Sequence, residues 1–419
     1  MLNKKKDFLG IRNIIIKSHV LLSFVKNNLD AIFYKLYYRN KKRNQNLWVF
    51  GEWFGDKCCD NALFFANFLA KKHPHVKLVW ISKKETDLSR LDISVHRMVM
   101  DSEEAISTLK KAGVVFYVQG FMDVTATNRL YYSGALVVNL WHGVPWKKIG
   151  TDICKDSRAV YGMEFYNRLY GADWYLASSK EFARILVTAY RLEDDCIVKT
   201  GYPRNSLFYS PDHVRQCRER LAEFLSSNCD VSVNVHTRFI LYMPTFRDTT
   251  NEAFTFRNVS GIEDFLASEN VVLLQKSHYV TSKKVLNLEH RKGNRIFDIN
   301  NNLISQELLA ASDVLITDYS SCFFDFLLLD RPIIHFLYDY RYYCSVDRGL
   351  YYKKEEVACG NVVENTEDLV SALKENLDNP KKYSILRKER CKKFIGFESQ
   401  NSCEHIYNKV YSYIATKWG

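Results

Sequence analysis

Apolar and polar positions along this chain alternate in a way that predicts strands and helices in turn. From residue 47 onward, short apolar runs of four to six residues are separated by stretches of helical periodicity. Buried strands that alternate with helices are typical of parallel βα units. The runs form two series, which predict strands at 47–50, 76–81, 95–100, 114–118, 136–140, 174–177 and 196–199, and then at 239–243, 271–275, 296–299, 314–317 and 333–336.

Two series of parallel strands predict two doubly wound sheets, with a ligand cleft at the carboxyl ends of their strands. We therefore expect an α/β protein of GT-B-like shape, in which two Rossmann-type domains face each other. The sequence contains neither a Gly-x-Gly-x-x-Gly turn nor a Gly-x-x-x-x-Gly-Lys loop, which argues against dehydrogenases and P-loop enzymes. The predicted parts are residues 1–46, a first domain at 47–209, a helical connector at 210–236, a second domain at 237–400 and a C-terminal helix at 401–419.

Positive charge is concentrated at the start of the chain. Of the net charge of +11, residues 1–46 carry +9, because they hold eleven lysines and arginines against two aspartates. Apolar residues recur at helical spacing between these cations, which predicts an amphipathic helix on an anionic membrane surface. The alternative is a helix docked on the protein with a solvated basic face. Since no stretch approaches the roughly 20 apolar residues of a membrane span, we expect peripheral attachment.

The remaining composition excludes several other classes of protein. The basic segment lacks an aromatic stacking platform on a recognisable fold, so we expect no nucleic-acid partner. Eleven scattered cysteines without a Cys-x-x-Cys pair predict reduced cytosolic thiols. Paired acids with metal-ligand spacing are absent around the predicted turns, and Asp60 with Asn61 is more typical of a helix cap. We therefore expect no metal and no cofactor.

A candidate phosphate site follows the strand at 314–317. Ser320 and Ser321 lie in the turn before an apolar helix, whose first NH groups have no internal acceptor and attract anions. The alternative is that the two serines only cap this helix. Asp325 lies one turn further on the same face, where it could reach a ligand hydroxyl or else pair with a neighbour such as Arg331.

Polar side chains also follow four other predicted strands. His142 lies on a loop after the strand at 136–140, where an imidazole can accept a proton near neutral pH. Arg204 and Arg247 lie on turns after two further strands, and arginine suits bidentate phosphate binding. The alternative for each arginine is a surface ion pair. The fourth cluster is 276–278, Lys-Ser-His.

These clusters together resemble the CDP-glycerol glycerophosphotransferases, which include teichoic-acid primases and polymerases and related capsule polymerases. The resemblance rests on WHGVPWKKIG at 141–150, TGYPRN at 200–205, PTFRD at 244–248, KSH at 276–278 and LITDYSSCFFD at 315–325. It implies a two-Rossmann fold at the cytoplasmic face of the cell membrane, with the acceptor on the first domain and the CDP donor on the second. It also implies metal-independent transfer of glycerol phosphate from CDP-glycerol, with release of CMP.

The resemblance further implies site residues. His142 would be the catalytic base, and His278 would be the second essential histidine. The residues that would bind CDP-glycerol, with Arg247 added from its place at a strand end, are Trp141, Gly143, Val144, Pro145, Arg204, Pro244, Thr245, Arg247, Lys276, Ser277, Ser320, Ser321 and Asp325.

Several alternatives stay open at this point. The donor could be CDP-ribitol, another CDP-polyol or a nucleotide sugar, and a non-enzymatic nucleotide-binding or assembly protein is a further rival. The acceptor could be lipid-linked or polymeric, and the enzyme could add one unit or many. A homo-oligomer is compatible with the sequence.

Overall fold

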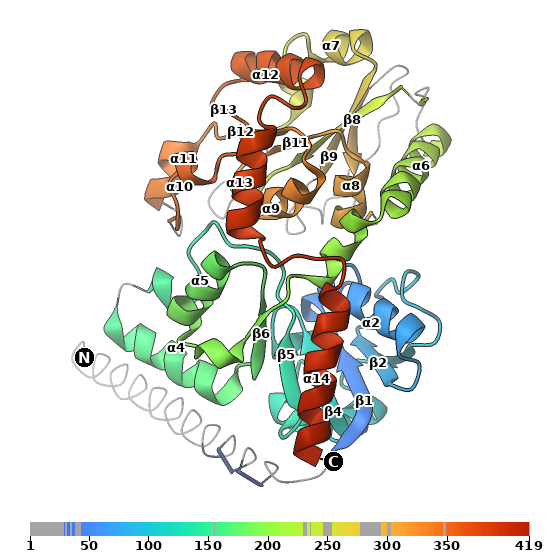
Figure 1. The fold of residues 1–419 in the computed structure, drawn as a ribbon, viewed down its shortest axis with the longest axis vertical. Helices are drawn as coiled ribbons and strands as arrows, with labels where there is room; N and C mark the ends of the chain where they lie inside the picture. The colour runs from blue at the N-terminus through green and yellow to red at the C-terminus, as the bar shows by residue number, and fades with distance from the viewer. Residues whose placement is uncertain are drawn as a thin grey trace, which may run out of the picture.

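The structure is a computed structural model that describes residues 29, 32–33, 36–37, 43–154, 156–228, 233–234, 236–245, 254–276, 295–299, 303–346 and 349–418. Two lobes stand one above the other, each built on a parallel sheet with helices packed around it (Figure 1). This arrangement confirms the expected α/β fold with two facing Rossmann-type domains.

The first sheet has seven strands in the order β3-β2-β1-β4-β5-β6-β7, and every neighbouring pair is parallel. Its centre is fully covered, because all six residues of β4 are buried, as expected of a parallel sheet with helices on its faces. The strands are β1 (Asn44–Phe50), β2 (Lys77–Ser82), β3 (His96–Val99), β4 (Ala112–Tyr117), β5 (Leu136–Asn139), β6 (Trp174–Ala177) and β7 (Ile197–Lys199).

The second sheet has six parallel strands in the order β10-β9-β8-β11-β12-β13. All twelve strands predicted from the apolar runs are present, and among the described residues β13 is the one strand that the sequence missed, because its three residues are too few to form a recognisable run. The strands are β8 (Arg238–Met243), β9 (Val271–Lys276), β10 (Ile296–Ile299), β11 (Val314–Thr317), β12 (Ile333–Phe336) and β13 (Asn361–Val363).

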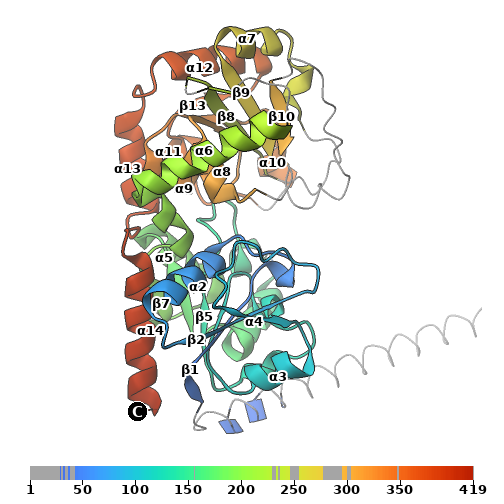
Figure 2. The same cartoon turned by 90° about the vertical axis from the view of Figure 1, so that its right-hand side faces the viewer.

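The helices divide between the lobes, and the chain crosses back once near its end. The first lobe holds α2 (Asn61–Lys72), α3 (Glu103–Leu109), α4 (Ser157–Tyr170) and α5 (Lys180–Tyr190). The second holds α6 (Pro211–Asn228), α7 (Ile262–Ser268), α8 (Ser305–Ala311), α9 (Cys322–Phe326), α10 (Tyr340–Val346), α11 (Lys354–Val357), α12 (Thr366–Asp378) and α13 (Ser384–Phe394). The final helix, α14 (Ser402–Trp418), returns to the first lobe (Figure 2).

Two of these helices lie next to the points where the chain passes from one lobe to the other. The helix α6, which occupies most of the predicted connector, packs on the second lobe, where Arg218 donates to the Asp313 carboxylate at 3.0 Å. The helix α14 packs on the first sheet, where the Tyr407 ring lies 5.8 Å from the Trp48 ring. The C-terminal segment therefore ties the second lobe to the first.

Most of the predicted membrane-associating segment, residues 1–46, lies outside the described residues, so its helix stays a prediction. Its boundary needs a correction, because β1 already begins at Asn44. Arg43, one of the eleven cations counted in this segment, is buried in the first lobe, where it is 5% exposed and donates to the carbonyls of Leu109 and Ser133. Within the part of the chain that the structure describes, no helix is long and apolar enough to cross a membrane.

Candidate active site between the two lobes

A cavity of about 180 Å³ lies between the lobes, at the carboxyl ends of strands from both sheets. Both lobes contribute to its wall, as expected of ligand sites in doubly wound folds. The lining residues are Trp53, Lys57, Cys59, Asp60, His142 and Arg204 from the first part of the chain, and Met243, Pro244, Lys276, Ser305, Gln306, Leu309, Ser320, Ser321, Cys322 and Asp325 from the second.

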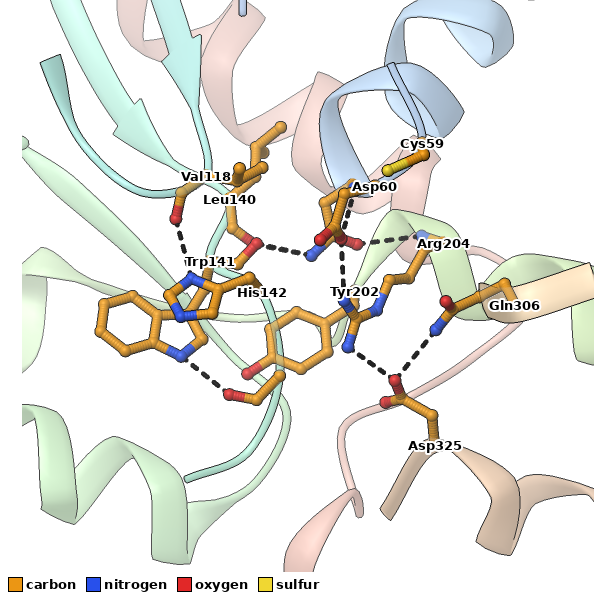
Figure 3. Close-up of polar contacts among 12 residues, drawn as sticks. Cys59, Asp60, Val118, Leu140, Trp141, His142, Tyr202, Arg204, Gln306 and Asp325 are labelled. Carbon is orange, nitrogen blue, oxygen red and sulfur yellow. Dashed lines mark hydrogen bonds and ion pairs between the residues drawn. The ribbon is translucent and has the colours of Figure 1, made fainter. Parts of the chain in front are cut away.

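His142 is held in one orientation by its own lobe. Its Nδ1 lies 3.1 Å from the Val118 carbonyl oxygen, which can only accept, so Nδ1 carries the hydrogen and Nε2 of the neutral ring is left as an acceptor (Figure 3). The ring stacks on Trp141, with centroids 5.0 Å apart, and meets the edge of Trp53 at 6.0 Å. Burial lowers the pKa of His142 below its ordinary value, so the imidazole is neutral at pH 7 and can act as a base.

The backbone beside His142 is strained. Trp141 has a φ of 59°, a left-handed conformation that costs a bulky residue about 1–3 kcal/mol. Three hydrogen bonds hold it there: Nε1 of Trp141 donates to the Gly143 carbonyl at 2.8 Å, its own N–H donates to Asn139 at 2.8 Å, and Nδ2 of Asn61 donates to its carbonyl at 2.8 Å. Trp141 thus supports His142 from behind and does not line the cavity.

At Gly143 the loop that carries His142 lies close to the serine turn of the second lobe. Its φ is 132°, and a Cβ atom added there would lie 2.9 Å from Oγ of Ser321 and 3.0 Å from Nη2 of Arg204. With this positive φ, a larger residue would be strained and would have to displace the side chain of Ser321 or Arg204. The absence of a side chain therefore lets the His142 loop reach the serine turn of the second lobe.

The serine turn has a more specific structure than the sequence suggested. Ser321 occupies the N-cap position of α9, yet its side chain makes no capping hydrogen bond, which does not support the alternative that it only caps the helix. The turn is held instead by Asp318, which accepts the N–H groups of Ser320 at 3.2 Å and of Thr245 at 2.7 Å. Asp318 therefore fixes two loops that follow neighbouring strands.

Arg204 does not have the environment that was predicted for it. It is 6% exposed, and it donates from Nη1 to Asp60 at 2.8 Å and from Nη2 to Asp325 at 2.6 Å (Figure 3). Burial alone would lower the pKa of Arg204, but the two carboxylates raise it above its ordinary value. Since Asp60 belongs to the first lobe and Asp325 to the second, Arg204 is a buried ionic link between the lobes and not a surface ion pair.

Asp325 is correspondingly unable to serve a ligand freely. It is 1% exposed, and its two oxygens accept from Arg204, from Asn205 at 3.0 Å and from Gln306 at 2.9 Å. The predicted partner Arg331 was wrong, because that guanidinium donates to the carbonyls of residues 310 and 312. The alternative of an ion-paired carboxylate describes Asp325 better than contact with a ligand hydroxyl.

A third carboxyl group near this network is Glu398, which lies between α13 and α14. Both oxygens of Glu398 accept the N–H of Tyr202 at 3.0 Å, two residues before Arg204. Burial, and then the nearby Asp325, raise the pKa of Glu398 well above its ordinary value. The shift favours the protonated, neutral form of the carboxyl group, which limits the negative charge in the network.

Two lysines from opposite lobes line the cavity, and the sequence indicated only one of them. Lys276, at the end of β9, donates to the Leu303 carbonyl at 2.7 Å, and burial lowers its pKa to about 8. Repulsion from Lys57 contributes to this lowering, and burial also lowers the pKa of Lys57 itself. Two desolvated cations near each other favour an anionic ligand, such as a phosphate.

The lowered pKa of Lys276 gives a pH dependence. Deprotonation above about pH 8 removes a positive charge from the cavity, so we expect kcat/KM for an anionic donor to fall as the pH rises through that value. Lys276→Met should lower kcat/KM and abolish this limb of the profile. As a control, Lys77→Met changes an exposed lysine at the start of β2 and should leave the limb in place. An unchanged limb in Lys276→Met would contradict the assignment.

The other predicted residues are distributed as follows. His142, Arg204, Pro244, Lys276, Ser320, Ser321 and Asp325 line the cavity together. Trp141, Gly143, Val144 and Thr245 are buried behind it, and Pro145 is half-buried in the same loop. Arg247, Ser277 and His278 lie outside the described residues. Within the described ranges, no group of three or more His, Cys, Asp or Glu side chains could hold a metal ion.

Several lining residues escaped the sequence reasoning. Asp60 was predicted only as a helix cap, and it does cap α2 by accepting the N–H of Asn61, but it also binds Arg204 and Nε1 of Trp53, the latter at 3.0 Å. Trp53 and Lys57 follow β1, so the rule that polar groups gather at strand ends could have found them. Gln306 lies on α8 and carried no such signal.

The loop that carries His142 also pairs with the second lobe. The N–H of Lys148 donates to the Gly349 carbonyl at 3.0 Å, and the N–H of Tyr351 donates to the Trp146 carbonyl at 2.9 Å. The Trp146 ring packs on Tyr319, with centroids 5.7 Å apart. The loop is therefore fixed against both sheets at once, which sets the distance across the cavity.

Comparison with known proteins decides the family. A family model described as CDP-glycerol:poly(glycerophosphate) glycerophosphotransferase matches residues 32–412. The chain belongs to this family. Membership confirms the resemblance that the motifs indicated and the expected enzyme class, a glycerophosphotransferase, and it argues against a non-enzymatic protein.

Individual relatives agree with this glycerophosphotransferase assignment. The teichoic acid poly(glycerol phosphate) polymerase of Bacillus spizizenii is 31% identical over 247 residues, which cover 56% of this chain and 60% of the relative. The teichoic acid glycerol-phosphate transferase of Staphylococcus aureus is 28% identical, over 88% of this chain and 94% of the relative. The solved structure of the wall teichoic acid polymerase TagF has a TM-score of 0.77 at 20% identity, covering 95% of this chain and 96% of that chain, which confirms the fold.

Proposed function

We propose that this chain transfers glycerol phosphate from CDP-glycerol to a hydroxyl group of a lipid-linked or polymeric acceptor and releases CMP, in the synthesis of a teichoic acid or a capsule-like polymer. One observation carries the proposal beyond family membership. His142, with Nε2 left as an acceptor, lines the same interlobe cavity as Lys276, Ser320 and Ser321. A base on one wall and phosphate-binding groups on the other are what transfer of a phosphoryl group to a hydroxyl requires.

The chemistry follows from this placement. The acceptor oxygen attacks the phosphorus that bears glycerol, and the bond from that phosphorus to the CMP oxygen breaks in line. Nε2 of His142 takes the hydroxyl proton, while Lys276 and the two serines stabilise negative charge on the phosphates, each by roughly a few kcal/mol. In this proposal His278 binds or protonates the leaving phosphate, and Arg247 binds the donor phosphates. Arg204 acts indirectly, because Asp60 and Asp325 already occupy its guanidinium.

The size of the cavity supports a phosphate-binding role for the described residues. Its volume of about 180 Å³ is below the roughly 300–1,000 Å³ of sites that enclose a whole small molecule. A diphosphate fits that volume better than a complete CDP-glycerol does. We infer that the described cavity holds the reacting end of the donor.

Purified protein with CDP-glycerol and defined lipid-linked acceptors tests the proposed function. CMP release together with a single added unit would indicate a primase, and a ladder of products a polymerase. CDP-ribitol is the main competing donor, because teichoic acid ribitol-phosphate polymerases of Staphylococcus aureus are also similar to this chain. The proposal predicts the highest kcat/KM with CDP-glycerol. Preference for CDP-ribitol or a UDP-sugar, or no CMP release with any pair, would overturn it.

We also propose that the chain attaches peripherally to the anionic cytoplasmic face of the membrane through its basic N-terminal segment. Exposed aromatic side chains on α4 support contact with a lipid surface, since Tyr161, Phe165 and Tyr166 are 71%, 42% and 42% exposed. Removal of residues 1–42, which keeps the buried Arg43, should reduce flotation with phosphatidylglycerol vesicles. Equal flotation of the shortened and full chains would argue against the segment.

A further inference from the structure

A buried aspartate that the proposed mechanism does not use lies behind the catalytic loop. Asp123 follows β4, is 0% exposed, and accepts three backbone N–H groups. Its Oδ2 accepts from Val118 at 2.9 Å and Gln119 at 2.8 Å, and its Oδ1 accepts from Phe54 at 2.8 Å. The donors come from two different loops, one after β4 and one after β1, so a single carboxylate fixes both.

Both of these loops contact the side chain of His142. Val118, whose N–H donates to Asp123, is the residue whose carbonyl oxygen accepts the Nδ1 hydrogen of His142 at 3.1 Å. Phe54, the other donor, follows Trp53, whose ring meets the imidazole edge at 6.0 Å. The position of Asp123 therefore sets both the hydrogen-bond acceptor of the base and one of the two rings that confine it.

We propose that Asp123 is a positioning residue for His142, which it orients by fixing the Val118 carbonyl and the Trp53 loop. The inference rests on the proposed function, in which His142 is the base. Charge-assisted hydrogen bonds from a carboxylate to backbone N–H groups are roughly twice as strong as neutral ones, so they suit this task. Asp123 does not line the cavity, so it would act through other residues and not on the substrates themselves.

The second lobe also has a buried aspartate, Asp318, that joins two loops by accepting their backbone N–H groups. In the two strand orders, β8 and β11 are neighbours near the centre of their sheet, as β1 and β4 are in the first. Asp318 follows β11 and accepts N–H groups from the loops after β8 and β11, at Thr245 and Ser320. In each sheet, a buried carboxylate thus joins the two loops that diverge at the cavity. The parallel indicates a role in shaping the site, beyond local packing.

The hydrogen bonds that Asp123 accepts depend on its ionisation state. Burial raises its pKa to about 6, so the carboxylate is charged at neutral pH and loses an acceptor oxygen as the pH falls below that value. The titratable groups that face it are Glu52, Tyr117 and Tyr132. Those that face His142 are Asp60 and Arg204.

Asp123→Asn tests the proposal, because an amide offers one acceptor and places an NH₂ group against backbone donors. We expect kcat to fall about 10²-fold, with KM for CDP-glycerol little changed, since a small misplacement of a catalytic group has an effect of that size. The bond from Nδ1 to the Val118 carbonyl raises the pKa of His142, so its loss should also move the acid limb of kcat to lower pH. A purely structural defect would lower kcat without moving the limb.

Asp101→Asn is a matched control. Asp101 holds the next part of the same segment, accepting from Thr125 at 2.6 Å and Ala126 at 2.9 Å, whereas the N–H groups of Val118 and Phe54 donate to Asp123. It should leave the limb unchanged. If Asp123→Asn does not fold, Asp123→Glu carries the test, because it keeps the charge and displaces it by one methylene, so a smaller shift in the same direction is expected.

Titration of the His142 ring by NMR, assigned with His142→Gln, gives the same test without any substrate. A lower pKa of His142 in the Asp123 variants supports the proposal, and an unchanged pKa overturns it. A fall in kcat with an unmoved acid limb also overturns it. Absence of CMP release from the wild-type protein would reject the proposed function alone, since the NMR result stands independently.

Discussion

His142→Gln should lower kcat for CMP release by a factor of about 10²–10⁴, the usual contribution of a general base. Glutamine retains much of the volume beside Trp141 but cannot take a proton, so the affinity for CDP-glycerol should change little. Because burial lowers the pKa of His142, the turnover of the wild-type protein should rise through a pH below 6.5 and be level at neutrality. Steady-state rates from pH 5 to 8 and calorimetric binding of the donor measure both effects.

The control for this experiment is His96→Gln. His96 is exposed on β3, pairs with Glu104 at 3.3 Å and is not among the residues that line the cavity. It should have wild-type turnover and the wild-type acid limb. If His142→Gln kept turnover within about threefold of the wild type, another group would have to accept the proton and His142 would lose its assignment.

Arg204→Met should lower the free energy of unfolding by about 3–5 kcal/mol, because removal of the cation leaves Asp60 and Asp325 buried without compensation. Urea denaturation measures this change. Arg220→Met is a control, since Arg220 is half exposed and pairs with Glu307 at 3.2 Å, a type of pair worth about 0–1 kcal/mol.

Arg204→Met also distinguishes a role in linking the lobes from a role in binding a donor phosphate. If the guanidinium links the lobes, Asp325→Asn added to Arg204→Met should recover part of the lost stability, because one uncompensated charge disappears. If it binds a donor phosphate directly, Arg204→Met should keep its stability and raise KM for CDP-glycerol at least tenfold. That second result would restore the role predicted from the sequence and would contradict the ionic link.

Much of the fold could be predicted from local pattern, and the limits have physical causes. Buried parallel strands are continuous apolar runs, so twelve strands were located within a few residues. The missed strand β13 has three residues, and one of them, Val362, is exposed, so no run formed. The start of β1 was missed because Asn44 to Asn46 are polar and precede the buried part of the strand.

The candidate site was predictable to the extent that its residues follow strands. His142, Lys276, Ser320 and Ser321 came from that rule and line one cavity. Arg204 also came from it, but its partners could not, since Asp60 and Asp325 lie 144 and 121 residues away in the chain. A pattern records which residue types follow a strand, but not which opposite charges the packing of two lobes brings within 3 Å.

The sequence by itself therefore determined the two sheets, the family and the places of His142 and the serine turn, because each depends on residues close together in the chain. Only the tertiary structure decided which groups are free to meet a ligand. The packing of the lobes pairs Asp325 with Arg204. It also brings Lys57 and Lys276 to the wall of one cavity. Asp123 is placed beside the loop residue Val118, which binds His142. These outcomes depend on desolvation and on charges contributed by distant segments, and both arise only when the lobes pack.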